Sequence, residues 1–328
     1  MVKKNDLNFK VSLIITAGFI LLCAAVYVVT NAGYSKDVIL QKANAFYSDE
    51  RYFMSAKYFS KALSLGASGP EIYRNYAAAL LRLGNYDDAV KYLLLSAEGD
   101  PANYETYYSL GNAYYQKARL TNSAGKFEQA ASYLEKAASL SPETEKTYLL
   151  IGNCYRSFGQ QENARAWYRR ALLSGNFSQA GFYNLIGHTF KEEGRFKEAI
   201  DYYTRAVTAD YSFVAAYCNI GDMYVKLNDF GSAQLYYEKA ISVNPDFAAP
   251  YVKIGMLLAE QNKHDEAVPW YLKALSKNAD DEKANYLLGT AYNEMGRKSD
   301  AVEFLKKAAY LGSDEAVYEL RNMGVDLR

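Results

Sequence analysis

The chain has 328 residues, and 37 Lys and Arg residues balance 37 Asp and Glu residues, so the formal net charge is zero. Half of the residues are hydrophobic, which predicts a folded chain. A neutral chain without a basic block argues against a nucleic-acid-binding protein, because such proteins need clustered Lys and Arg. Three cysteines without a C-x-x-C pair and only two histidines argue against a disulfide framework and a metal site, and we expect no cofactor.

The amino-terminal part contains a short basic tail, residues 1–10, followed by an apolar segment, residues 11–30. No charged residue occurs between Lys10 and Lys36. Twenty helical residues rise about 30 Å, the thickness of the hydrocarbon layer of a bilayer, so we predict a transmembrane anchor. A cleaved signal peptide is the alternative, although the apolar run is longer than the usual signal core.

The orientation of this anchor follows from the flanking lysines. Lys3, Lys4 and Lys10 precede the apolar segment, whereas Lys36 and Lys42 follow it over a similar distance. This small bias favours an amino terminus in the cytoplasm and a repeat domain outside it. The opposite orientation stays open as an alternative.

A repeat follows the anchor and extends almost to the carboxyl end. Six segments share an aliphatic residue followed by glycine, and their glycines are separated by 41, 35, 34, 34 and 34 residues. The glycines are Gly111, Gly152, Gly187, Gly221, Gly255 and Gly289. An alanine lies twelve residues after the glycine in the regular repeats, at Ala164, Ala199, Ala233, Ala267 and Ala301. A fixed period of this length is the signature of a repeat architecture.

This order and period resemble the tetratricopeptide repeat, in which helix A, a tight turn and helix B form one unit. The resemblance implies an all-α fold, a right-handed α-solenoid of about eight helix-turn-helix repeats behind one N-terminal transmembrane helix. The predicted repeats occupy residues 36–69, 70–103, 104–144, 145–179, 180–213, 214–247, 248–281 and 282–315, and residues 316–328 form a capping helix.

Glycine in helix A lets helix B approach closely, and the glycines and asparagines between the helices, such as Gly84 and Asn228, tolerate the left-handed conformation that ends a helix. Most of the 32 tyrosines are therefore expected to pack between helices. The third repeat has seven extra residues near positions 117–127, and we expect its hairpin to be longer.

No catalytic motif emerges from the sequence. A phosphate-binding G-x-x-x-x-G-K-[ST] loop and an H-E-x-x-H zinc motif are both absent. His188 and His264 lie too far apart along the repeats to share a site, and Cys154 and Cys218 are expected to be free thiols. We therefore expect the protein not to be an enzyme.

The resemblance implies that helices A line a concave groove, with the side chains one residue after the glycine and three residues before it facing the groove. In the amino half, these positions and the next helical turn give the candidate peptide-binding residues Arg74, Tyr108, Asn112, Asn153 and Arg156. In the carboxyl half, the positions one residue after the glycine and three residues before it give Asn184, His188, Cys218, Asp222, Met256, Tyr286 and Thr290. Arginine can pair with carboxylates, tyrosine offers rigid contact area and asparagine can bond a peptide backbone, so we expect the partner to bind the amino half.

The resemblance thus implies a membrane-tethered scaffold that mediates protein–protein interactions. It resembles bacterial inner-membrane, single-pass proteins whose repeat domain lies in the periplasm and helps assemble or regulate a cell-envelope complex. The expected partners are a protein or peptide in the groove and the lipid bilayer around residues 11–30, without nucleic acid. The alternatives are a solute- or peptide-binding solenoid that serves a transporter, or the same scaffold facing the cytoplasm.

Overall fold

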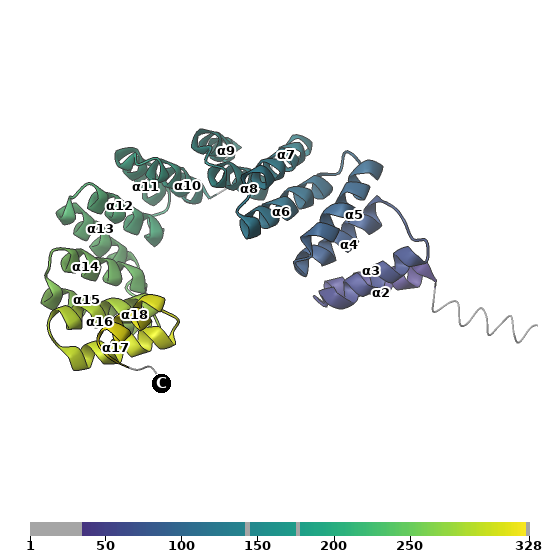
Figure 1. Ribbon diagram of the computed structural model, residues 1–328. Coiled ribbons are helices and arrows are strands. Elements are labelled where there is room, and N and C mark those ends of the chain that lie inside the picture. Colours follow the sequence, from purple (N-terminus) through teal and green to yellow (C-terminus); the bar gives the residue numbers. More distant parts are fainter. Residues whose placement is uncertain (1–34, 142–144, 175–177, 326–328) are drawn as a thin grey trace, which may run out of the picture. The chain divides into compact units, whose positions relative to one another are not determined.

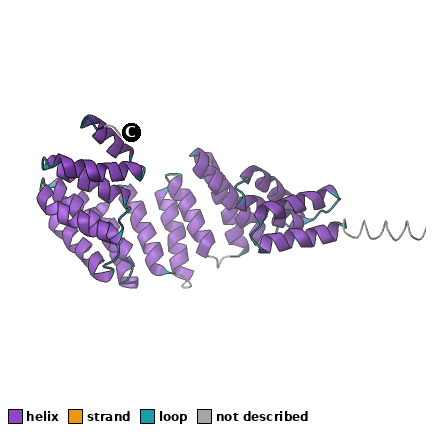
Figure 2. Ribbon diagram, turned by 90° about the horizontal axis from the view of Figure 1, so that it is seen from below, coloured by secondary structure: helices purple, strands orange, loops and turns teal. Residues whose placement is uncertain are grey.

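The computed structural model describes residues 35–141, 145–174 and 178–325. In this part of the chain every regular element is an α-helix (Figure 2). The predicted anchor, residues 11–30, lies outside the described residues. Among the residues that are described, no helix is both long and apolar enough to cross a membrane.

The helices belong to two compact units, a first unit that ends at Gly159 and a second unit that begins at Gln160 (Figure 1). The helices of the first unit are α2 (Lys36–Ser48), α3 (Tyr52–Ser64), α4 (Pro70–Arg82), α5 (Tyr86–Gly99), α6 (Tyr104–Thr121), α7 (Ala124–Leu140) and α8 (Glu145–Ser157). The helices of the second unit are α9 (Gln161–Ser174), α10 (Gln179–Glu192), α11 (Phe196–Ala209), α12 (Val214–Lys226), α13 (Phe230–Val243), α14 (Ala248–Glu260), α15 (His264–Lys277), α16 (Glu282–Glu294), α17 (Lys298–Tyr310) and α18 (Asp314–Asn322).

Within each unit, every helix packs against the next helix in the sequence. We call the even-numbered helices α2 to α16 helices A and the odd-numbered helices α3 to α17 helices B. Some helices A of neighbouring repeats also contact one another, as α4 contacts α6 and α6 contacts α8 in the first unit. This order of contacts is that of stacked helical hairpins, in which each hairpin buries its apolar face against its neighbours.

The turns between helices A and B have the left-handed backbone that the sequence predicts. Gly84 and Gly194 both have φ 74°, and Asn228 and Asn262 have φ 59° and 60°. The first hairpin differs, because Glu50 takes this conformation with φ 58°. Glycine adopts it without a steric penalty and asparagine at a low one, so these residues end helix A without strain.

The helix A glycines mark close contacts with helix B. A Cβ atom at Gly221 would lie 2.4 Å from a ring carbon of Tyr237, and one at Gly255 would lie 2.4 Å from Tyr271. Tyr237 is 2% exposed and Tyr271 is fully buried. Each glycine therefore provides the space that a helix B tyrosine fills.

The third hairpin is longer than the others, as its extra residues predict. Helix α6 has 18 residues and α7 has 17, whereas most other helices A and B have 13 or 14. Phe127, near the start of α7, is 4% exposed and packs edge-on against Tyr115 of α6, with ring centroids 5.7 Å apart. The extra residues thus extend both helices of the hairpin rather than forming a loose loop.

The last helix among the described residues, α18, has nine residues and packs on α17. Its Ala316 and Leu320 are fully buried and join Leu305 and Ala308 of α17 in one apolar cluster. The helix therefore covers an apolar face of α17. The predicted capping segment, residues 316–328, includes residues 326–328, which lie outside the described residues.

Candidate peptide-binding groove

The five predicted groove residues lie on three successive helices A of the first unit. Arg74 is on α4, Tyr108 and Asn112 are on α6, and Asn153 and Arg156 are on α8. All five are partly exposed. Because α6 contacts both α4 and α8, these side chains belong to one continuous helix A surface.

Arg74 forms an ion pair with a residue of the neighbouring helix A. Its Nε lies 3.2 Å from a carboxylate oxygen of Glu105, and the Arg74 side chain is only 19% exposed. The ion pair joins α4 to the first turn of α6. An acidic ligand at Arg74 would therefore have to compete with Glu105, which is 70% exposed and able to move away.

Tyr108 and Asn112 are held by neighbours on their own helix. The Tyr108 ring stacks on Tyr104 at 5.9 Å, and the Tyr104 hydroxyl shares a hydrogen bond of 2.7 Å with Thr147 of α8. The Tyr108 hydroxyl is protonated at physiological pH, and burial raises its pKa further above the ordinary tyrosine value. Asn112 Oδ1 accepts a 3.4 Å hydrogen bond from Gln116. This surface thus presents aromatic area and amide groups in fixed positions.

Helices A of the second unit carry polar side chains that bond the tyrosines of helices B. His188, which follows Gly187, has its Nδ1 3.1 Å from the Tyr203 hydroxyl. Asp222, which follows Gly221, accepts a 2.8 Å hydrogen bond from the Tyr237 hydroxyl. In these two repeats, the residue after the glycine therefore stabilises the packing of helix A on helix B. The sequence pattern indicates only ligand binding at these positions.

The next repeat breaks this pairing. Met256 follows Gly255, and the Tyr271 hydroxyl is buried without a hydrogen-bond partner among the described residues. Met256 itself is 38% exposed. A buried hydroxyl without a partner costs about 1–3 kcal/mol, so the methionine is unfavourable for the fold at this position.

A pocket of about 380 Å³ opens beside Met256, in the second unit. Residues of helices α10, α12 and α14, of α13 and of the start of α16 line it. Asp222 and Met256, two of the residues predicted for the carboxyl half of the groove, are among them. The lining also includes four lysines that the predicted groove positions did not contain, Lys191, Lys226, Lys253 and Lys283.

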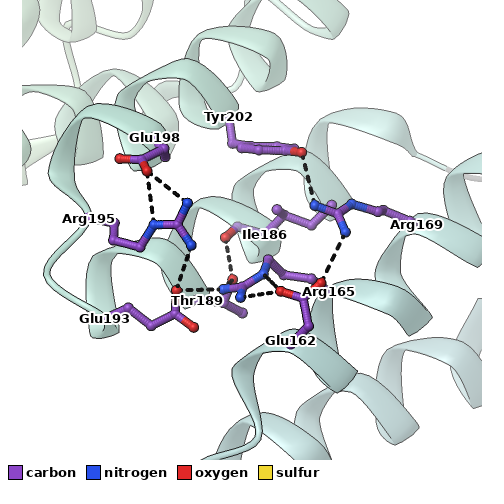
Figure 3. Close-up of polar contacts among 9 residues, drawn as sticks. All are labelled: Glu162, Arg165, Arg169, Ile186, Thr189, Glu193, Arg195, Glu198 and Tyr202. Carbon is purple, nitrogen blue, oxygen red and sulfur yellow. Dashed lines mark hydrogen bonds and ion pairs between the residues drawn. The ribbon is translucent and has the colours of Figure 1, made fainter.

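A different polar cluster joins the first three helices of the second unit (Figure 3). Arg165 of α9 has a side chain that is only 3% exposed, and it forms ion pairs of 2.6 Å with Glu162 and 2.9 Å with Glu193. Its guanidinium also lies 4.4 Å from the ring centroid of Phe190 and donates to Thr189 at 3.3 Å. The charged groups of this cluster pair with one another, so we interpret the cluster as stabilising the fold.

No feature of a metal centre is found in residues 35–141, 145–174 and 178–325, where no group of His, Cys, Asp or Glu could hold an ion. Cys154 and Cys218 are buried and free, as predicted. Burial raises the pKa of both thiols to about 12, which makes them unsuited to act as nucleophiles near neutral pH.

Stacked two-helix hairpins, close glycine contacts between helices A and B, and left-handed turns define a helical-repeat protein. Family profiles agree. Those described as tetratricopeptide repeat match residues 40–104, 115–180, 180–213, 214–247 and 282–312, and one described as TPR repeat matches residues 255–296. The chain belongs to the tetratricopeptide repeat family, a class of scaffold that binds protein or peptide partners.

Several solved structures are similar to this chain, and two of them are described as TPR proteins. The chain is 20% identical to the C-terminal part of a TPR repeat-containing protein from Cytophaga hutchinsonii, over 76% of this chain and 99% of that one, with a TM-score of 0.54. A MamA structure is 27% identical over 55% of this chain and 97% of its own, with a TM-score of 0.42. YrrB, described as a TPR protein with an unusual peptide-binding site, is 25% identical over 58% of this chain and 99% of its own, with a TM-score of 0.41. No curated protein matches the sequence significantly.

Proposed function

We propose that this protein is a membrane-tethered scaffold, without catalytic activity, that binds a protein or peptide partner on its helix A surface and serves the assembly or regulation of a cell-envelope complex. The observation that carries the binding role is the helix A surface itself. In both units it presents partly exposed tyrosine, asparagine, methionine and charged side chains on neighbouring helices, among them Tyr108 and Asn112 in the first unit and Met256 in the second.

The membrane tether is supported by the sequence. Residues 11–30 form an uncharged apolar segment of bilayer length, and Lys3, Lys4 and Lys10 precede it. A tether would place the first unit nearest the bilayer, where a partner in the same membrane would reach it. Localisation in an inner membrane with an extracytoplasmic repeat domain is the arrangement that this charge bias favours.

Protease digestion of spheroplasts tests the tether and its orientation. With the full chain in the membrane, protease added outside should remove the repeat domain and leave a small fragment that contains the anchor. Protection of the repeat domain in intact spheroplasts, with digestion only after lysis, would place it in the cytoplasm. Extraction of undigested membranes with alkaline carbonate is a separate check. Release of the full chain into the soluble fraction would contradict the tether.

A crosslinking pull-down of the full chain from native membranes tests the scaffold role. The chain should co-isolate a specific protein partner, and this partner should be absent when an unrelated protein with the same anchor is used. If the chain is isolated repeatedly without a specific partner, the scaffold role is wrong.

A further inference from the structure

The pocket in the second unit combines an apolar floor with a basic rim. The floor consists of Met223, Val252 and Leu257, which are 1%, 5% and 2% exposed, together with the exposed Met256. Its volume of about 380 Å³ is at the lower end of the size of ligand pockets in proteins. The floor therefore suits one or two apolar side chains rather than a large cofactor.

Three lysines of the rim are available for a ligand. Lys191, Lys226 and Lys283 are exposed, and none of them has an ion-pair partner among the described residues. Lys253 is different, because its Nζ lies 2.7 and 2.9 Å from the two carboxylate oxygens of Asp222. The three available ammonium groups make the rim attractive to carboxylates.

The acidic residues of the lining reduce this charge only in part. Asp222 is bonded by Lys253 and by the Tyr237 hydroxyl, and Asp281 accepts a 2.8 Å hydrogen bond from the backbone N–H of Ala284. Glu260 is the one lining carboxylate without such a bond in the described part of the chain. Glu260 and Asp281 both keep their negative charge, because a hydrogen bond from a neutral N–H does not remove it, so the three lysines exceed these two carboxylates by one charge.

Met256 gives a second, independent indication of a ligand. In the two preceding repeats, the residue after the glycine is polar and bonds the helix B tyrosine, as Asp222 bonds Tyr237. Met256 leaves the Tyr271 hydroxyl without a partner and exposes 38% of its own surface at the pocket. Positions where a local rule of the fold is broken are often functional, and methionine is an adaptable contact for apolar ligands.

The spacing of the lysines favours an extended ligand. Lys191, Lys226 and Lys283 belong to α10, α12 and α16, and the helix A α14 lies between the last two in the sequence of repeats. Packed helices are about 8–10 Å apart, so one carboxylate cannot contact all three ammonium groups. A peptide segment with several carboxylates can.

We propose that this pocket binds an acidic segment of a partner protein, with an apolar side chain on the floor between Met223, Val252 and Met256 and flanking carboxylates at Lys191, Lys226 and Lys283. The inference rests on the proposed scaffold function, because it takes a peptide rather than a free solute as the ligand. It assigns a contact site to the carboxyl half of the helix A surface, in addition to the amino half that the sequence favours.

Fluorescence anisotropy with the full chain in detergent micelles tests this proposal. The probe is a fluorescein-labelled peptide with one leucine flanked on both sides by aspartates. We expect saturable binding that weakens as salt rises, and at least tenfold weaker binding when the leucine becomes serine or the aspartates become asparagines. Absence of binding to the wild-type chain, or equal binding of the asparagine peptide, would overturn the proposal.

Two matched sets of variants locate the site. The triple variant Lys191→Ala, Lys226→Ala, Lys283→Ala should bind the peptide about tenfold more weakly, since exposed ion pairs contribute modestly and three are lost. The control Lys197→Ala, Lys298→Ala, Lys306→Ala removes the same charge from exposed lysines of helices B and should bind like the wild type. Equal losses in both triple variants would show a nonspecific charge effect and overturn the site.

The methionine provides the matched test of the floor. Met256→Ser should weaken peptide binding several-fold, whereas Met295→Ser, at a methionine with the same 38% exposure outside the pocket, should not. Displacement of the peptide by a small branched-chain carboxylate would indicate that the pocket is a solute site. If the wild-type chain does not bind the peptide but self-associates, and the lysine triple variant does not self-associate, the ligand would be a second copy of this chain. Either result would overturn the proposal, while a partner still crosslinked in native membranes would leave the scaffold function intact.

Discussion

Gly221 and Gly231 lie in the two helices of one hairpin, but a methyl group would have opposite consequences at the two positions. At Gly221 it would lie 2.4 Å from the Tyr237 ring, which is packed in the core. At Gly231, on the exposed start of α13, it would meet only Asp229 Oδ1, at 3.9 Å.

Gly221→Ala should therefore lower the free energy of unfolding by about 1–3 kcal/mol, because the tyrosine or the helix has to shift. Gly231→Ala should raise it by up to about 1 kcal/mol, because alanine loses less backbone entropy in a helix. Urea unfolding and hydrogen exchange of the two variants measure the difference, and the exchange rates should rise mainly in the hairpins next to α12. A neutral Gly221→Ala variant would show that the two helices are not in close contact.

The thiols of Cys154 and Cys218 should be unreactive in the folded protein. Burial raises the pKa of each to about 12, above the ordinary thiol value near 9. In a Cys23→Ser background at pH 8, both should react with a disulfide reagent only after unfolding. Rapid reaction of either thiol in the folded protein would contradict its burial.

The sign of the pH effect on stability follows from the same shift. Below the ordinary thiol pKa, both the folded and the unfolded chain keep their thiol protons, and stability is unaffected. As pH rises from about 9 toward 12, the unfolded chain loses these protons first, so the folded state loses stability. A urea titration at several alkaline pH values measures this loss.

At the residue scale, the sequence predicts the positions that the backbone restricts but not the reach of long side chains. The glycine period correctly identifies the close contacts and the left-handed turns. The groove residues are predicted from their distance in sequence from the helix A glycine. At these positions, the carboxyl half has few basic residues. Lys226 and Lys283 lie at other offsets and still line the pocket, because a lysine stem is long and flexible.

At the scale of elements, the buried Arg165 fixes α9 to the neighbouring hairpin. Its side chain is 3% exposed and pairs with Glu193, which lies directly after α10 and is 27% exposed. By contrast, Arg195 and Glu198 form a pair in which both side chains are about half exposed. Figure 3 shows both ion pairs, but breaking the Arg165–Glu193 pair should lower the free energy of unfolding more than breaking the Arg195–Glu198 pair.

Glu193→Ala should lower the free energy of unfolding of this region by about 1–3 kcal/mol, because a buried guanidinium loses one of its two carboxylate partners. Glu198→Ala should cost less than about 1 kcal/mol, as for other exposed ion pairs. Hydrogen exchange of α9 and α10 in the two variants makes the comparison. Equal effects would mean that Arg165 is better hydrated than its burial indicates.

The repeat pattern could not predict this cluster. The position after the helix B alanine holds Arg165 in α9 but Ile200, Gln234 and Val268 in the next three helices B. A period describes what the repeats share, whereas this contact depends on one arginine and on Glu193 beyond the end of the next helix. The longer third hairpin, in contrast, was predictable because an insertion in a regular repeat has to lengthen a helix or a turn.

At the scale of the whole molecule, two contact regions are available on helices A. The first unit has the Arg74–Glu105 pair with Tyr108 and Asn112, and the second unit has the pocket beside Met256. Each lies within a single unit.

Site-specific photo-crosslinking in native membranes tests most directly whether helices A form the partner-binding surface. A photo-reactive phenylalanine is placed in the full chain at Tyr108 or Met256 on helices A, and at the exposed Lys197 or Lys306 on helices B. We predict that the same partner is crosslinked from at least one helix A position and from neither helix B position. Crosslinks to a partner from the helix B positions alone would contradict the account, because binding would then use the opposite surface of the repeats.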